Sequence, residues 1–298
     1  MKTMSRMALG LSIFTLLFFS SCQKESETPN PEQEEFAAVA SESDAEAEVI
    51  FNGVFDDVVG VNAEVGFGGT GNFGGASPSF DAGLNSPTGI DSNHCFVVTV
   101  KHLSQDTTFP VQITIDFGAG CTGRDGKIRK GKVITEYSDR LIYPEATATT
   151  TFDGFYVNDV KVEGTHQITN LSTSNALKFE VSVNGKLSKE NGNFTEWTST
   201  RSITHISGLA TPFDPRDDVF GISGEASGFG KRGDKIFEWE TAISSPLIKK
   251  FSCRWIVQGA IIFRKGASNE CQVDYGNGDC DNKATLTVNG KARIISLH

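Results

Sequence analysis

The chain has 298 residues, a formal net charge of −10 and an aromatic content of 10%. Of the 27 basic and 37 acidic residues, two bases lie in residues 1–22, and one base and nine acids lie in residues 23–48. Residues 49–298 therefore carry 24 basic and 28 acidic residues. This nearly balanced part has no basic stripe to neutralise phosphates, which argues against nucleic-acid binding. Its length of about 250 residues is enough for one large β domain or two small ones.

Residues 1–22 have the pattern of a secretory signal peptide. Two basic residues are followed by an apolar run that is shorter than the roughly 20 residues of a spanning helix. A Cys at the cleavage boundary is typical of the bacterial lipobox, in which the thiol is diacylated, so we expect Cys22 to be lipidated. Phe19 and Ser21 depart from the usual lipobox residues. Plain secretion with a chance Cys is the alternative.

Residues 23–43 are predicted to be an acidic, disordered tether, because so charged and apolar-poor a segment cannot offset its ordering entropy. Its opening QKESE looks like the export tags of surface lipoproteins, which favours the outer membrane and exposure at the cell surface. Behind the tether, Ser43 and Glu46 have capping-box spacing, and apolar residues recur at helical intervals. We expect an amphipathic helix at residues 44–60 that faces the core, since its polar side is acidic.

Residues 66–90 are a Gly-rich loop, and from residue 94 onward polar and apolar residues alternate with the period of half-buried strands. Asn184-Gly185 and Asn289-Gly290 predict hairpin turns. The connections are too short for crossover helices. We therefore predict one mainly β domain over residues 44–298, a large antiparallel meander with one N-terminal helix packed against it. The meander is either a twisted sheet or an open barrel.

Two stretches far apart share a pattern, DFGAGCTGRDGKIRKGK at 116–132 and DYGNGDCDNKATLTVNGK at 274–291. Both run Asp-aromatic-Gly-x-Gly and then Cys, with a Gly-Lys ten residues after that Cys. Another Cys opens a strand before each of them. We interpret residues 95–137 and 253–297 as an internal repeat of a three-strand unit.

Disulfides are expected in a chain that is exported to an oxidising compartment. A turn at residues 264–269 would bring the cysteines that flank the second hairpin together at its open end. A turn centred on Thr108 would do the same for the first hairpin. The rival pairing is Cys271–Cys280, with Cys253 unpaired. The predicted disulfides are Cys95–Cys121 and Cys253–Cys280, which leave Cys271 unpaired.

Several tempting motifs are rejected. The spacing G-x-G-x-x-G occurs from Gly66 and from Gly118, but turn-and-strand sequence follows the second match, where a dinucleotide site needs a helix. We therefore expect no cofactor. Acidic residues crowd one turn of the second repeat, yet the ligand spacing of the helix-loop-helix calcium motif is absent. We favour a Gly/Asp turn there, and the weak calcium candidates are Asp274, Asn277, Asp279 and Asp281.

No catalytic residue is predicted, because the chain has neither a G-x-S-x-G elbow nor an H-E-x-x-H motif. His166 and His205 lie in strands and are expected to be ordinary core or surface residues. Glu196, Glu238 and Glu240 flank tryptophans, and this leaves glycoside hydrolysis open as an alternative. Strand tryptophans usually belong to a core. The candidates for stacking a ligand are Trp197, Trp239 and Trp255.

GRDGKIRKGKVITEYS, TTTFDGFYVNDVKVEGTHQITN and DYGNGDCDNKATLTVNG, together with the lipobox and the tether, resemble β-rich lipoproteins of Gram-negative envelopes. The resemblance implies a location and a fold style, and no catalytic residues. Our leading hypothesis is a non-enzymatic outer-membrane lipoprotein that binds a glycan, lipid or protein partner, which predicts an exposed aromatic patch. A carrier of an apolar ligand would instead need a Phe-lined groove, and a glycan hydrolase two carboxylates in a cleft.

Overall fold

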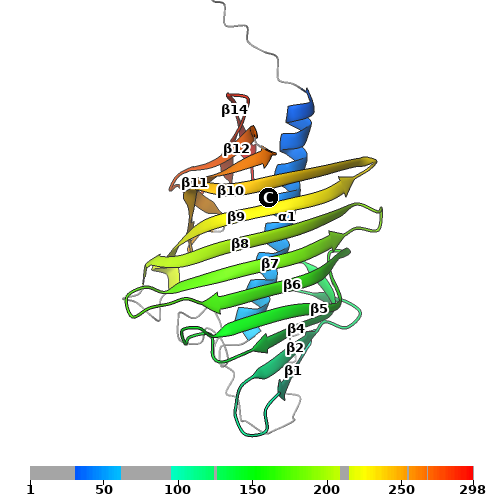
Figure 1. The fold of residues 1–298 in the computed structure, drawn as a ribbon, viewed down its shortest axis with the longest axis vertical. Helices are drawn as coiled ribbons and strands as arrows, with labels where there is room; N and C mark the ends of the chain where they lie inside the picture. Colours follow the sequence, from blue (N-terminus) through cyan, green and yellow to red (C-terminus); the bar gives the residue numbers. More distant parts are fainter. Residues whose placement is uncertain are drawn as a thin grey trace, which may run out of the picture.

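The computed structural model describes residues 31–61, 95–123, 126–208, 215–253, 255–266 and 268–297. The predicted signal peptide, Cys22 and the Gly-rich loop at 66–90 lie outside these residues. Within the described part, fourteen strands form one sheet and α1 (Pro31–Val61) packs against it (Figure 1). The prediction of a mainly β, antiparallel fold is confirmed, and the sheet is open rather than closed into a barrel.

The strands follow chain order across the sheet, and each is antiparallel to its neighbours, as their short connections require. The two-residue β3 is the exception, since it pairs with β4 beside the main path. The strands are β1 (Val97–His102), β2 (Val111–Asp116), β3 (Cys121–Thr122), β4 (Ile128–Tyr137), β5 (Thr147–Val157), β6 (Val160–Asn170), β7 (Lys178–Ser188), β8 (Phe194–Ser207), β9 (Val219–Arg232), β10 (Lys235–Lys250), β11 (Ile256–Lys265), β12 (Ser268–Asn277), β13 (Lys283–Val288) and β14 (Lys291–Ser296), with the short η1 (Pro215–Asp217) before β9.

Helix α1 has 31 residues and is nearly twice as long as predicted. It begins at Pro31, where a proline costs no hydrogen bond, so residues 31–43 are helical and not part of a disordered tether. The prediction of a disordered tether failed because its acidic residues, which we expected to be solvated, form ion pairs with basic residues of distant strands, such as Glu35 with Lys235. Among the described residues, no helix combines the length and the apolar character needed to cross a membrane.

The sheet has two faces of opposite character, because alternate residues of a strand point to opposite sides. We call the face against α1 the inner face and the other the outer face. Helix α1 runs behind the sheet in Figure 1 and crosses its strands from the β14 end toward β4. The inner face carries the core, in which Phe51 of α1 and Phe155, Trp197 and Trp239 of the sheet are almost fully buried.

Asn184-Gly185 does not form the predicted hairpin turn, since both residues lie inside β7 and the turn follows near Gly192. The glycine has another role. A Cβ at Gly185 would lie 2.1 Å from Cζ of Phe51, so the missing side chain makes the space in which this ring sits. The ring stacks on Trp197, with centroids 5.8 Å apart and an interplanar angle of 12°. Asn289-Gly290 does form the predicted turn, with positive φ at both residues.

Both predicted disulfides are confirmed, Cys95–Cys121 and Cys253–Cys280, and Cys271 is buried without forming a disulfide. The second hairpin turn is tighter than the predicted 264–269, because Lys265 still pairs with Ser268. In the first unit, the register of β1 and β2 does not continue to Cys121, which pairs through β3 with Arg129.

The two stretches that we interpreted as a repeat share one local hydrogen bond. The carboxylate of Asp116 accepts a hydrogen bond from the backbone N–H of Gly118 at 2.9 Å, and that of Asp274 accepts one from Gly276 at 2.8 Å. In the first stretch this turn follows the end of β2 at Asp116, whereas in the second it lies inside β12, next to an irregularity in the pairing of β12 with β11.

Candidate functional site

A buried polar contact joins α1 to the middle of the sheet. Asp44 is 3% exposed, and its Oδ1 accepts hydrogen bonds from Nε1 of Trp197 at 2.8 Å and of Trp239 at 3.2 Å. The two indoles come from β8 and β10, so one carboxylate oxygen ties the helix to two strands. A buried indole N–H needs such a partner, because leaving it unsatisfied costs about 1–3 kcal/mol.

The surroundings of Asp44 disfavour its charge. Burial, with the neighbouring carboxylate of Glu48, raises the pKa of Asp44 to about 6, while the two indole donors and Arg201 act in the opposite direction. Arg201 is buried and forms an ion pair with Glu48, with Nη2 3.0 Å from Oε2. Tyr275 of β12 faces the same acids, and burial raises the pKa of its phenol. The cluster therefore contains a carboxyl group that titrates close to neutral pH.

Asp44→Asn is expected to flatten the pH dependence of stability. A pKa that folding raises from 3.8 to about 6 adds stability that is complete below pH 4 and is lost as the pH rises through 6. The amide oxygen of Asn still accepts the indole hydrogen bonds but does not ionise. At pH 7.5 we expect the variant to be more stable than the wild type, by on the order of 1–3 kcal/mol. Urea denaturation at pH 5 and pH 7.5 measures this, and an unchanged difference between the two pH values would contradict it.

Acidic residues of α1 on both sides of Asp44 form ion pairs that hold the rest of the helix against the sheet. The acids of the helix face basic residues of β8 to β11 and of the β7–β8 turn, and these contacts involve strands far apart in the sequence. The pairs, with their N···O distances, are Glu32–Lys265 at 3.5 Å, Glu35–Lys235 at 2.5 Å, Glu42–Arg232 at 2.9 Å, Glu46–Lys189 at 2.7 Å and Glu48–Arg201 at 3.0 Å.

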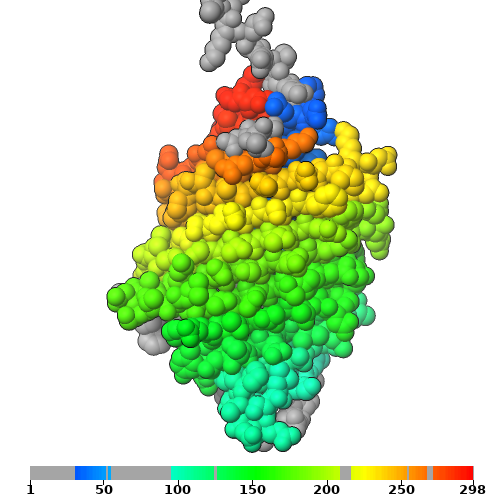
Figure 2. All heavy atoms as spheres, viewed as in Figure 1, coloured from blue at the N-terminus to red at the C-terminus, as the bar shows by residue number. Residues whose placement is uncertain are grey.

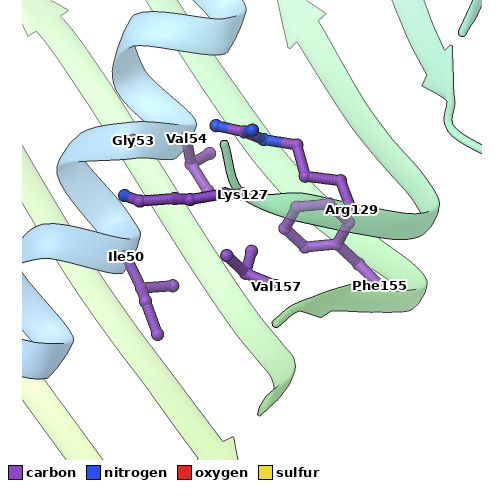
Figure 3. Close-up of a pocket in the computed structure, with 7 residues that line it drawn as sticks. All are labelled: Ile50, Gly53, Val54, Lys127, Arg129, Phe155 and Val157. Atoms are coloured by element: carbon purple, nitrogen blue, oxygen red, sulfur yellow. The ribbon is translucent and has the colours of Figure 1, made fainter. Parts of the chain in front are cut away.

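Little room remains between α1 and the sheet. The best-formed hollow lies beside Gly53 and Val54 of the helix and is lined by Arg129, Phe155 and Val157 of the sheet (Figure 3). Its volume is about 10 Å³, enough for a single water molecule. In the described part of the chain, the inner face thus holds the helix and has no space for an organic ligand.

Two histidines lie in the interior. His205 of β8 has Nε2 2.8 Å from Oδ1 of Asp218 and stacks on Phe220, so it ties the end of β8 to the start of β9. His166 of β6 is fully buried, and burial lowers its pKa to about 4, which keeps it neutral. His205 contacts the carboxylate of Asp218, whereas a nucleophile–base pair needs a hydroxyl or thiol at the ring.

The structure separates the other sequence-predicted candidates. Trp197 and Trp239 are buried under α1 and offer no open face to a ligand, and Trp255 is half-buried ahead of β11. Of the calcium candidates, Asp274 and Asp281 accept hydrogen bonds from backbone N–H groups two residues later. No group of three acidic, His or Cys side chains suited to a metal occurs in the described residues.

The outer face is a regular array of small polar side chains. Along β5 to β9 these residues alternate with the buried ones of the inner face, and their partners across the strands form continuous rows. Of fifteen positions in three neighbouring rows, thirteen are hydroxyl or amide side chains and two are glutamates. The hydroxyl rows, in strand order, are Thr147, Thr169, Glu180, Ser202 and Ser223; Thr149, Gln167, Ser182, Thr200 and Glu225; and Thr151, Thr165, Asn184, Thr198 and Ser227.

An aromatic pair, Phe194 and Phe229, borders the hydroxyl rows on this same face. The ring centroids are 6.0 Å apart, and Phe229 is 41% exposed. Lys186 lies over Phe194, with Nζ 4.7 Å from the ring centroid, and is neutralised by Glu196 at 2.8 Å. Figure 2 shows the outer face as a continuous surface on which the strands lie side by side.

The carboxylates considered for hydrolysis also lie here. Glu196, Glu238 and Glu240 are exposed on the outer face, and Phe229 stands between Glu196 and Glu238 in the strand register. Two small hollows of the described part lie beside α1, and none of these three acids lines either of them.

Sequence reasoning missed the role of Asp44 and the aromatic pair, whereas Phe51 was among the apolar residues that defined the core-facing side of the predicted helix. The alternation around Trp197 could have placed Phe194 on the opposite face, because the two residues are three positions apart in one strand and alternate positions point to opposite sides. Phe229 stands between Gly228 and Gly230, and a large apolar side chain amid glycines was a further signal. The chain matches no protein-family model, no curated protein and no solved structure.

Proposed function

We propose that this chain is a lipid-anchored protein of the bacterial outer membrane that binds a partner through the outer face of its sheet, without catalysis. One observation supports the binding role above all others. The described inner face is covered by the chain's own helix, whereas the outer face carries the exposed ring of Phe229, with the half-buried Phe194 beside it, next to the hydroxyl rows. Exposed aromatic side chains on an otherwise polar face mark interaction sites.

The two alternative functions have weaker support. A carrier of an apolar ligand needs a groove, but the inner-face phenylalanines pack against α1 and against one another, as Phe51 does with Phe152. A glycan hydrolase needs two carboxylates converging on one bond in a cleft. Glu196 is instead engaged by Lys186 on an open surface.

The position of α1 suggests how an anchored domain would be oriented. Pro31 lies at the β14 end of the sheet, where Gln33 accepts a hydrogen bond from Asn289 (Figure 1). A chain of nine residues reaches at most roughly 30 Å, so a lipid on Cys22 would hold this end of the sheet close to the bilayer. The strands near β1 would then lie farthest from the membrane.

Cys22→Ala is expected to abolish lipidation. Full-length protein expressed in a Gram-negative host with an alkyne-bearing fatty acid should take up the label and sediment with outer membranes. The variant should lose both properties, because no other residue can become the acylated N-terminus. Cys271→Ala is the matched control and should keep both. If the Cys22→Ala variant kept the label, or if the wild type took up none, the proposed lipid anchor would be wrong.

The binding role is tested by photo-cross-linking in intact cells. A photoreactive residue at the exposed outer-face position Thr200 should give discrete adducts, and the same residue at Arg293 on the edge strand β14 should not. Adducts of equal pattern and yield at both positions would contradict binding through the outer face.

A further inference from the structure

The hydroxyl rows have an unusual charge content for an exposed sheet. Thirteen of fifteen side chains are neutral, none is basic, and the two acids, Glu180 and Glu225, lie on different strands. Ordinary protein surfaces carry roughly 25–35% charged residues. Within the rows a partner meets hydrogen-bonding groups and little charge to desolvate or to pair, and the exposed Glu238 and Glu240 lie at their β10 border.

This composition narrows the chemistry of the partner. Hydroxyls and amides both donate and accept hydrogen bonds, so they match a surface that is itself dense in hydroxyls. A nucleic acid or another polyanion would need basic residues, which the rows lack. A bilayer surface would need an apolar face with a basic rim. A protein partner would need a wide, well-packed apolar centre, whereas the apolar groups here, Phe194, Phe229 and Ile236, stand at one border of the rows.

The geometry is periodic as well as neutral. Within a row, residues on neighbouring strands are about 4.8 Å apart, and neighbouring rows are roughly 7 Å apart along the strands. Equivalent groups therefore recur across five strands. A polymer of identical units can satisfy such an array repeatedly. The aromatic pair adds two flat apolar surfaces next to Ser227, where the apolar face of a sugar ring can stack.

Resting on the proposed binding function, we propose that the partner is a neutral polysaccharide, bound along the hydroxyl rows and stacked on Phe194 and Phe229. Phe229 provides the open ring. Phe194 is held in place by Lys186, whose charge is cancelled by Glu196. In this proposal the protein binds the polysaccharide without altering it.

The test uses the full chain in mild detergent and native affinity electrophoresis against soluble β-glucan, α-mannan and galactan, with polygalacturonate as the polyanion. At least one neutral polymer should retard the protein, and polygalacturonate should not. Phe194→Ala/Phe229→Ala should weaken that retardation about tenfold. Phe229→Tyr keeps the ring and should bind like the wild type. Ile294→Ala, at a 74% exposed position of β14, is the control for lost apolar surface.

A second variant guards against a folding defect. Thr200→Lys places one charge in the middle row on exposed backbone that it does not disturb, and it should weaken neutral-polymer binding while the melting temperature stays unchanged. Retardation by none of the three neutral polymers, or undiminished retardation of both variants, would overturn the polysaccharide. If the Thr200 cross-links persist in that case and are to protein, the partner is a protein and the proposed function stands. If they are also absent, both fail.

Discussion

Phe51→Ala is expected to lower the free energy of unfolding by about 3–5 kcal/mol, the usual cost of emptying a buried phenylalanine site. The ring is 1% exposed, stacks on Trp197 and meets Phe152 edge-on at 6.2 Å. Its removal leaves a void at the centre of the contact between α1 and the sheet. Urea denaturation followed by tryptophan fluorescence measures the change and reports on Trp197 directly.

Gly185→Ala provides the reciprocal test. In the wild type the new methyl group would clash with the Phe51 ring, which Trp197 and Phe152 prevent from moving, and we expect a loss of about 1–3 kcal/mol. In the Phe51→Ala background the same methyl enters vacated space and should cost almost nothing. A cycle with no coupling between the two positions would show that Phe51 does not sit over Gly185.

Loss of the Cys253–Cys280 disulfide is expected to destabilise the domain by about 3–4 kcal/mol, because the bond restricts the unfolded chain over 27 residues. Cys253→Ser/Cys280→Ser should show this in urea denaturation. Cys95→Ser/Cys121→Ser, with a separation of 26, should lose a similar amount. Equal stability of either variant and the wild type would contradict the constraint.

Cys271 separates this arrangement from its rival. Its thiol is 5% exposed and opposite Phe263, so alkylation should require denaturant. Unreduced peptide mapping should find Cys271 alkylated and the peptides of Cys253 and Cys280 linked. A linked Cys271–Cys280 peptide would show that the other pairing forms in solution.

The sheet was predictable because its signals are local. The alternation of Phe179, Val181 and Val183 defined a strand and its buried face, and the equal spacing of cysteines in two copies defined the disulfides. Short connections then made the meander almost unavoidable. Each of these signals lies within about thirty residues of the structure that it specifies.

The failures concern partners that are distant in sequence. Glu35 looked solvated because Lys235 is 200 residues away, and Asn184-Gly185 looked like a turn because the ring that needs the glycine belongs to α1. The same holds for the site. Phe194 and Phe229 form a pair only once β8 and β9 lie side by side, and Asp44, which accepts the hydrogen bonds of the Trp197 and Trp239 indoles, lies 153 and 195 residues away from them.

Helix α1 also sets an order of events. It is made first, yet its contacts extend to Asn289, 256 residues later. Until β13 has paired, the surface against which the helix packs is incomplete, and the charged residues of the helix keep it soluble. A sheet that is truncated or paired out of register would leave α1 undocked and open to proteases. Docking of the helix therefore depends on a complete and correctly paired sheet.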